Sequence, residues 1–257
     1  QKLFYLTTWD KLLLFLKKMI DKNITFIIPA AGKSSRFKSK KSKIFYNYKK
    51  KALIQHVVEK CLKFSNRLII VVNKKDTKEL KKILFIYTKI KFIFVLQNEA
   101  KGMGHAISIA LRKSKTVYTS VIWSDQTYLL LSTIRRTISF LKKNNSLLCF
   151  PIYNKKLPYA YILRDSNKKF KDIVQTREGG KVVKIGESDC GFFIFKTFII
   201  KKMLQELIEE KKIITNKTKE IDFLQAFKFF KKIGNIDIIK AGGVKDTIGI
   251  NTIEDLI

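Results

Sequence analysis

Short runs of consecutive apolar residues alternate with segments of helical periodicity over residues 24–152. The apolar runs predict strands at residues 24–28, 68–72, 92–96, 117–123 and 146–152. Apolar positions three and four residues apart predict helices at residues 52–64, 76–84, 104–113 and 129–143. Strands that are apolar on both faces and alternate with helices are typical of a parallel sheet covered on both sides. We therefore expect an α/β fold of three layers, helix, sheet and helix.

The second half of the chain has a different order of elements. Strands are predicted at residues 159–164, 171–176 and 191–195 with no helix between them, followed by helices at residues 196–211 and 220–231. Two further strands, at residues 236–240 and 246–250, precede a short final helix. This order predicts a mixed, mostly parallel sheet. Because proline is scarce and no Gly/Ser-rich linker interrupts the pattern, we expect one continuous domain over residues 24–257.

Residues 1–23 precede the first predicted strand and carry an apolar stripe at helical spacing. The stripe consists of Trp9, Leu12, Leu13, Leu16, Met19 and Ile20. We expect a helical extension of undefined role that packs against the domain or against an upstream partner. The chain opens on Gln and ends abruptly on Leu-Ile, as a part of a longer protein would, so an additional domain or a homo-oligomer is an open alternative.

The charge of the chain is large but evenly spread. It carries 53 Lys and Arg against 21 Asp and Glu, a net charge of +32, and would attract polyanions at low salt. The lysines recur in pairs along the whole chain rather than in one basic arm, so we expect a small anionic substrate rather than nucleic acid. Every apolar run is interrupted by charge well before the roughly 18 residues of a membrane span, and no signal peptide is recognisable.

Three cysteines and two histidines are widely separated in the sequence, without the spacings typical of a zinc site. The cysteines, Cys61, Cys149 and Cys190, lie in apolar stretches, where we expect small core residues. An odd and sparse cysteine count is typical of a reducing compartment, so we expect a cytoplasmic protein.

Ligands of parallel sheets bind beyond the carboxyl ends of the strands, which directs attention to three loops. The first follows the first predicted strand and reads PAAGKSSRF over residues 29–37. Its small residues let the backbone approach a ligand closely, and successive N–H groups there can bind an anion. Arg36 and, seven residues later, Lys43 add two cations.

The second loop reads QNEAKGMGHA over residues 97–106. Gln97 offers a donor and an acceptor that suit the edge of a nucleobase, while Gly102 and Gly104 would let a planar ring lie against the backbone. His105 taken alone is typical of a structural histidine at a helix start. In the third loop, residues 123–126, Asp125 ends a buried strand, where its carboxylate could cap the next helix or hold Mg²⁺.

Five segments, in this order, resemble the motifs of sugar-1-phosphate nucleotidyltransferases, and most closely the uridylyltransferase domain of the bacterial bifunctional enzyme that makes UDP-N-acetylglucosamine. The segments are residues 29–37 (PAAGKSSRF), 50–57 (KKALIQHV), 95–106 (VLQNEAKGMGHA), 124–127 (SDQT) and 249–256 (GINTIEDL). The resemblance covers residues 24–257 and implies a Rossmann-like, three-layer nucleotidyltransferase fold. The chain has none of the hexapeptide repeats that mark the acetyltransferase half of the bifunctional enzyme.

The resemblance also implies a Mg²⁺-dependent reaction that serves nucleotide-sugar and cell-envelope polysaccharide synthesis. A phosphate oxygen of a sugar-1-phosphate attacks the α-phosphorus of an NTP, by preference UTP, and pyrophosphate leaves. Both reactants are anions, so catalysis consists of positioning and charge neutralisation. The implied roles are catalytic for Arg36 and Lys43; nucleotide-binding for Ala30, Ala31, Gly32, Lys33, Gln97, Gly102 and Met103; sugar-phosphate-binding for Ala160, Gln175 and Asp189; and metal-binding for Asp125 and Asn251.

Departures from these motifs gather at the sugar end. Ala160 stands where the family has glycine, Gln175 where it has glutamate, and Asp189 where it has asparagine. Losing a matched polar partner costs about 1–3 kcal/mol, enough to change the preferred acceptor. One alternative is therefore a cytidylyl- or guanylyltransferase acting on a polyol, choline or cofactor phosphate. Another is a non-catalytic nucleotide- or RNA-binding domain, against which the joint presence of both catalytic cations and both metal-binding residues speaks.

Overall fold

The computed structural model describes residues 20–32, 37, 41–252 and 255. Residues 1–19 of the predicted extension, the candidate site residues Lys33 and Arg36, and most of the predicted final helix lie outside these ranges. The strands are β1 (Ile24–Pro29), β2 (Asn47–Tyr48), β3 (Lys51–Ala52), β4 (Leu68–Val72), β5 (Ile93–Leu96), β6 (Tyr118–Ile122), β7 (Leu148–Lys156), β8 (Ala160–Arg164), β9 (Phe170–Gln175), β10 (Ile185–Asp189), β11 (Phe192–Lys196) and β12 (Ile236–Lys240). The α-helices are α2 (Leu53–Leu62), α3 (Thr77–Leu84), α4 (Met103–Leu111), α5 (Leu131–Asn144), α6 (Thr197–Glu209) and α7 (Phe227–Phe230). Short 3₁₀ helices are η2 (Lys43–Phe45), η3 (Thr176–Glu178), η4 (Leu224–Ala226) and η5 (Val244–Thr247).

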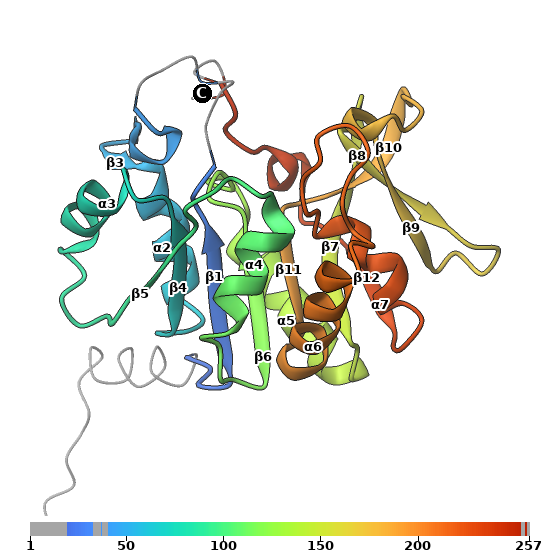
Figure 1. Ribbon diagram of the computed structural model, residues 1–257, viewed down its shortest axis with the longest axis horizontal. Helices are drawn as coiled ribbons and strands as arrows, with labels where there is room; N and C mark the ends of the chain where they lie inside the picture. Colours follow the sequence, from blue (N-terminus) through green and yellow to red (C-terminus); the bar gives the residue numbers. More distant parts are fainter. Residues whose placement is uncertain (1–19, 33–36, 38–40, 253–254, 256–257) are drawn as a thin grey trace, which may run out of the picture.

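An eight-stranded mixed sheet forms the centre of the fold (Figure 1). Its strands follow the order β10-β7-β11-β6-β1-β4-β5, and β12 pairs with β7. β1 is parallel to both β4 and β6, and β4 is parallel to β5, whereas β11 runs antiparallel between β6 and β7. These pairings confirm the expected α/β fold with a mixed, mostly parallel sheet.

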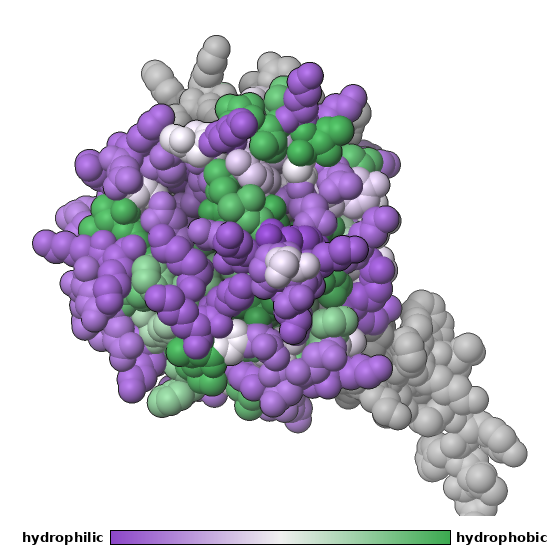
Figure 2. Space-filling model, turned by 90° about the vertical axis from the view of Figure 1, so that its right-hand side faces the viewer, coloured by the Kyte–Doolittle hydropathy of each residue, from purple (hydrophilic) through white to green (hydrophobic). Residues whose placement is uncertain are grey.

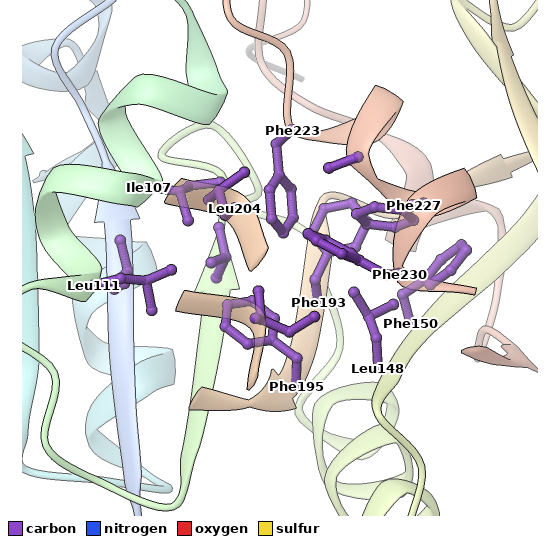
Figure 3. Close-up of a cluster of buried hydrophobic side chains, with 14 of the residues drawn as sticks. Ile107, Leu111, Leu148, Phe150, Phe193, Phe195, Leu204, Phe223, Phe227 and Phe230 are labelled. Atoms are coloured by element: carbon purple, nitrogen blue, oxygen red, sulfur yellow. The ribbon is translucent and has the colours of Figure 1, made fainter. Parts of the chain in front are cut away.

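Helices cover both faces of the sheet with apolar side chains. On one face, α4, α6 and α7 pack Ile107, Leu204 and Phe227 against Phe150 and Phe193 of the sheet (Figure 3). On the other face, residues of α2, α3 and α5 form a second buried cluster with the alternate side chains of β1 and β4. Burial on both faces explains why these strands are nearly continuous apolar runs in the sequence.

Two strands that pair with β7 bring the second half of the chain to the site. β10 and β11 both run antiparallel to β7, with Asp189 opposite Ile152 and Ile194 opposite Cys149. Between them Gly191 has a φ of 65°, and its carbonyl accepts the backbone N–H of Trp123 at 2.9 Å. The interrupted ladder therefore places the end of β10 beside the loop that follows β6. β10 was not predicted, because its residues IGESD are mostly polar and partly exposed.

The predicted strand at residues 246–250 is wrong. The 3₁₀ helix η5 occupies residues 244–247 instead, and Asp246 is fully buried. Its carboxylate accepts the Leu130 N–H at 2.6 Å, the Thr133 hydroxyl at 2.6 Å and the Gly242 N–H at 2.8 Å. Asp246 thus caps the N-terminus of α5 from a remote segment, which requires a turn rather than an extended strand.

The predicted helix at residues 220–231 is much shorter in the structure, where only η4 and α7 are helical. The backbone of Ile221 is engaged elsewhere: its N–H donates to the Lys101 carbonyl at 2.8 Å, and its carbonyl accepts the Gly104 N–H at 2.8 Å. Asp222 then accepts the N–H groups of Leu224 and Gln225, so the helical turns begin only after it.

The three cysteines are free and fully buried, as expected for core residues, and burial raises the pKa of each thiol. Among the described residues, no helix combines the length and the apolar character that a membrane span requires.

Replacing Asp246 by Ala should lower the free energy of unfolding by about 3 kcal/mol, because three donors lose a buried charged acceptor. Denaturant unfolding followed by circular dichroism measures this change. As a control, Glu210→Ala removes the exposed ion pair with Lys212 and should change stability by less than about 0.5 kcal/mol. Equal effects of the two substitutions would contradict the capping role of Asp246.

Candidate functional site

The candidate site lies where β1, β5 and β6 end on the same edge of the parallel part of the sheet, the edge at which ligands of such sheets bind. After β1, the Ala30 N–H donates to the Val71 carbonyl at 2.8 Å, which continues the ladder for one residue. Ala30 and Ala31 are buried, and Gly32 is exposed. A Cβ at Gly32 would meet no described atom within 4 Å, so there is open space in front of this backbone.

Three of the predicted site residues meet at this edge. The Lys43 ammonium lies 2.6 Å from Asp125 Oδ2, 3.3 Å from the Ile250 carbonyl oxygen and 3.5 Å from Asn251 Oδ1. The side chains of Lys43 and Asp125 are only 17% and 15% exposed, so the ion pair is largely shielded from water. The second carboxylate oxygen, Asp125 Oδ1, is buried and has no hydrogen-bond partner among the described residues.

The segment at residues 249–252 is held tightly against Asp125. The Ile250 N–H donates to the Asp125 carbonyl at 3.0 Å, and a Cβ at Gly249 would lie 3.3 Å from Asp125 Cγ. Asn251 donates its Nδ2 to the Gly249 carbonyl, while the Asp255 carboxylate accepts the Asn251 N–H at 2.7 Å. These contacts fix the amide of Asn251 with its oxygen toward Lys43.

The loop between β5 and α4 is fixed mainly by its own contacts. Gln97 is buried and donates its amide N–H groups to the Gly102 carbonyl at 3.1 Å and to His105 Nδ1 at 3.0 Å. A Cβ at Gly102, whose φ is 95°, would lie 2.6 Å from the Ile221 carbonyl oxygen, and one at Gly104 would also contact Ile221. The structure therefore gives both glycines a packing role beside Ile221.

Within the same loop, Met103 begins α4 and packs, partly buried, against the main core. His105 must be neutral at Nδ1 to accept the hydrogen bond from Gln97. Burial, together with the charges of Lys101 and Arg112, lowers the pKa of His105 below its ordinary value, which favours this neutral form.

The three residues assigned to the sugar phosphate come from two elements. Ala160 and Gln175 are directly opposite each other in the β8–β9 hairpin, a two-stranded sheet that Figure 1 shows beside β10 and α7. The amide nitrogen of Gln175 is buried without a hydrogen-bond partner among the described residues. Asp189 ends β10, where burial raises its pKa and its Oδ1 accepts the Gly191 N–H at 2.8 Å.

Sequence reasoning missed Gln126, which follows Asp125 and is buried. A Cβ at Gly191 would lie 2.7 Å from the amide nitrogen of Gln126, and a Cβ at Gly249 would lie 3.1 Å from it. Gln126 therefore fills the space between the turn after β10 and the 249–252 segment. Its Oε1 has no hydrogen-bond partner among the described residues. The only sequence signal was its place beside Asp125.

Most of the described chain matches a known protein family. Residues 26–188 match the model of the MobA-like NTP transferase domain. The chain belongs to this family. The match begins in β1 and ends in β10, so it spans all three candidate loops at the ends of β1, β5 and β6 and the hairpin.

Curated relatives of this family member carry the name bifunctional protein GlmU. The protein from Thermodesulfovibrio yellowstonii is 28% identical over 240 residues, which cover 90% of this chain and 50% of that protein. The protein from Solibacter usitatus is 27% identical over 180 residues, which cover 67% of this chain and 38% of that protein. The matched part of the chain thus spans about half, or less, of the length of these relatives.

Solved structures confirm the Rossmann-like nucleotidyltransferase fold. The inositol-1-phosphate CTP transferase from T. maritima superposes with a TM-score of 0.70 at 16% identity, over 91% of each chain. A UDP-glucose pyrophosphorylase complexed with UDP-glucose superposes with a TM-score of 0.68 at 20% identity, over 93% of this chain and 96% of that chain.

The lowered pKa of His105 predicts a pH-dependent contribution to stability. The contribution is fully present above about pH 6.5, the ordinary pKa of histidine, and is lost as the pH falls through the lowered pKa of the folded state. The stability advantage of the wild type over His105→Asn should therefore narrow between about pH 7.5 and pH 5. Urea unfolding of both proteins across this range measures it, and a difference independent of pH would contradict the neutral role of His105.

Proposed function

We propose that this chain is a Mg²⁺-dependent nucleotidyltransferase that joins an NTP, by preference UTP, to a sugar-1-phosphate and releases pyrophosphate. The observation that carries the proposal is the meeting of Lys43, Asp125 and Asn251 at the sheet edge. Membership of the NTP transferase family supports the reaction class. The motif resemblance supports the choice of UTP and N-acetylglucosamine-1-phosphate, or a related sugar phosphate, as substrates.

The residues present fit a magnesium ion. Carboxylate and amide oxygens are hard ligands of the kind that Mg²⁺ prefers, and Asp125 Oδ1 is a buried oxygen without a partner among the described residues. The Lys43 ammonium already lies among oxygens of Asp125, Ile250 and Asn251, where a positive charge is therefore favourable. We propose Asp125 and Asn251 as ligands. When bound, the metal ion would neutralise phosphate charge and orient the reacting groups.

The protein's own part in the reaction is positioning and charge. An oxygen of the acceptor phosphate forms a bond to the α-phosphorus, the bond to the pyrophosphate oxygen breaks, and the pyrophosphate keeps the electron pair. Lys43, and Arg36 by its place in the motif, would stabilise the charge on the transferring and leaving phosphates. The three cysteines are poor candidates for a nucleophile, because they are fully buried and burial raises the pKa of each thiol.

A second candidate acceptor class is favoured by the hairpin and β10. Gln175 presents an amide where the family motif has a carboxylate, and Asp189 presents a buried carboxyl where the motif has an amide. These two exchanges alter which hydrogen-bond donors and acceptors face the acceptor. A cytidylyl- or guanylyltransferase that uses a polyol, choline or cofactor phosphate is therefore the alternative to the sugar-1-phosphate enzyme.

Pyrophosphate release in the presence of Mg²⁺ tests the proposal, with UTP, CTP, GTP and dTTP each offered against sugar-1-phosphates and polyol phosphates. We expect release above background with UTP and a hexosamine or hexose 1-phosphate. Release with another pair would replace the substrates while keeping the reaction class. If folded protein released no pyrophosphate with any pair and bound RNA in a salt-sensitive way, the proposed enzymatic activity would be contradicted and a non-catalytic binding domain favoured.

The metal site can be tested apart from the substrates. Asp125→Ala should lower turnover about a hundredfold or more and abolish Mn²⁺ binding to the free protein, because a metal ligand is lost. Lys43→Met should lower turnover as well but bind Mn²⁺ at least as tightly as the wild type, because a competing positive charge is removed. Electron paramagnetic resonance of Mn²⁺ measures binding, and thermal melts verify the fold. Unchanged Mn²⁺ binding by Asp125→Ala would overturn the assignment.

A further inference from the structure

A segment far from the motifs forms part of the loop between β5 and α4. Residues 213–222, which we term the bridging loop, connect α6 to η4. Ile221 makes two backbone hydrogen bonds with the segment that holds Gly102 and Gly104. Its N–H donates to the Lys101 carbonyl, and its carbonyl accepts the Gly104 N–H, each at 2.8 Å. Because Gly102 and Gly104 leave no room for a Cβ beside Ile221, the conformation of this loop depends on where the bridging loop lies.

The other side of the bridging loop is held by an ionic cluster from the end of the β8–β9 hairpin. The guanidinium of Arg177 lies 3.0 Å from the Glu220 carboxylate and 3.7 Å from that of Asp222, on either side of Ile221. Glu178 accepts the Thr218 hydroxyl at 2.8 Å and two backbone N–H groups of the bridging loop at 3.3 Å.

These contacts join two shielded carboxylates to partly exposed partners. The side chains of Glu178 and Asp222 are each only 6% exposed, whereas those of Arg177 and Glu220 are 48% and 36% exposed. Burial alone would raise the pKa of Glu178, but hydrogen bonds from Thr218 and Lys217 and the charge of Arg177 outweigh it and hold the pKa below its ordinary value. Because Arg177 and Glu178 each have several partners, the network constrains geometry more firmly than a single exposed ion pair would.

The cluster begins directly after the acceptor residue Gln175. Arg177 and Glu178 form the 3₁₀ turn η3 that follows it, and the Gly180 N–H closes the turn on the Gln175 carbonyl at 3.0 Å. A Cβ at Gly180 would lie 2.7 Å from that carbonyl oxygen, so this turn has little freedom. A shift of Gln175 would therefore be transmitted to η3 and from there to the bridging loop.

We propose that Arg177 and Glu178 are positioning residues that couple the acceptor hairpin to the loop that holds the nucleotide. The path runs from Gln175 through η3 and the bridging loop to the backbone of Gly104. The proposal has two parts. The mechanical part, that Arg177 and Glu178 hold the bridging loop against Gly104, concerns the contacts alone. The functional part, that this affects substrate binding, rests on the proposed function. The same path implies that an acceptor bound at the hairpin tightens the binding of the nucleotide, and the reverse.

Amide hydrogen exchange tests the mechanical part without any substrate. Arg177→Met should speed the exchange of the Gly104 amide by about tenfold, because its acceptor on Ile221 is less firmly held. Arg164→Met is the matched control: Arg164 lies on the same hairpin and pairs with Glu187 at 2.5 Å, but within the part of the chain that the structure describes its hydrogen bonds go to Glu187 and Lys168 and not to the bridging loop. Arg164→Met should leave the exchange rate of the Gly104 amide unchanged. Unaltered exchange in Arg177→Met, or equal acceleration in the control, would overturn the coupling.

Kinetics test the functional part. Arg177→Met should raise KM for the nucleotide about fivefold to tenfold with a much smaller change in kcat, and Arg177→Lys should recover part of the loss. Adding Gly104→Ala, which disrupts the contact with Ile221 directly, should make the two effects less than additive. Additive effects, or a loss confined to kcat, would contradict the path.

The two proposals fail in distinguishable ways. If no substrate pair releases pyrophosphate, the exchange experiment still decides the mechanical coupling, and calorimetric binding of Mg²⁺ and UTP takes the place of KM. If pyrophosphate is released normally but Gly104 exchange does not respond to Arg177→Met, the proposed function stands and the coupling is wrong.

Discussion

The ion pair between Lys43 and Asp125 is the point around which this site is organised. It joins residues 82 positions apart, and Asn251, a further partner of the same ammonium group, is 208 positions from Lys43. A carboxylate held at the end of a buried strand is costly unless a cation lies beside it. The packing of the sheet edge therefore has to bring Lys43 to Asp125. The oxygens that stabilise the Lys43 ammonium suit a cation, and under the proposed function that positive charge is what attracts anionic phosphates.

The rigidity of that edge comes from contacts outside it. Asp246 attaches the turn before Asn251 to the start of α5. A shift of this segment would leave a buried carboxylate and its three donors without partners, which is costly. On the opposite side, Gly191 brings β10 against the backbone of Trp123. Side chains held in this way from two directions keep the geometry that phosphate transfer needs.

Sequence reasoning found most of the fold because burial on both faces leaves a continuous apolar run, which is how β1, β4 and β6 were located. It failed at residues 246–250, where a strand-like pattern hid the capping role of Asp246, since a pattern of neighbours does not report a partner 116 residues away. The resemblance to the family motifs assigned Lys43, Asp125 and Asn251 to one site, and the structure brings them together at one edge. The resemblance attributed Gly102 to the nucleotide alone, because the approach of Ile221 depends on tertiary structure that no local pattern encodes.

The departures from the family motifs have a structural explanation in where they lie. Two of the three departures, Ala160 and Gln175, belong to a two-stranded hairpin outside the eight-stranded sheet, and the third, Asp189, ends β10 within that sheet. Lys43 lies in η2 and Asp125 in the loop after β6, so neither belongs to the hairpin. Under the proposed function, substitutions on the hairpin would change which acceptor fits without moving the charged centre. The hairpin is nevertheless not independent, because Arg177 ties it to the loop between β5 and α4 through the bridging loop. If both proposals hold, acceptor choice can vary over a fixed reaction centre, and the position of the loop between β5 and α4 still depends on the hairpin.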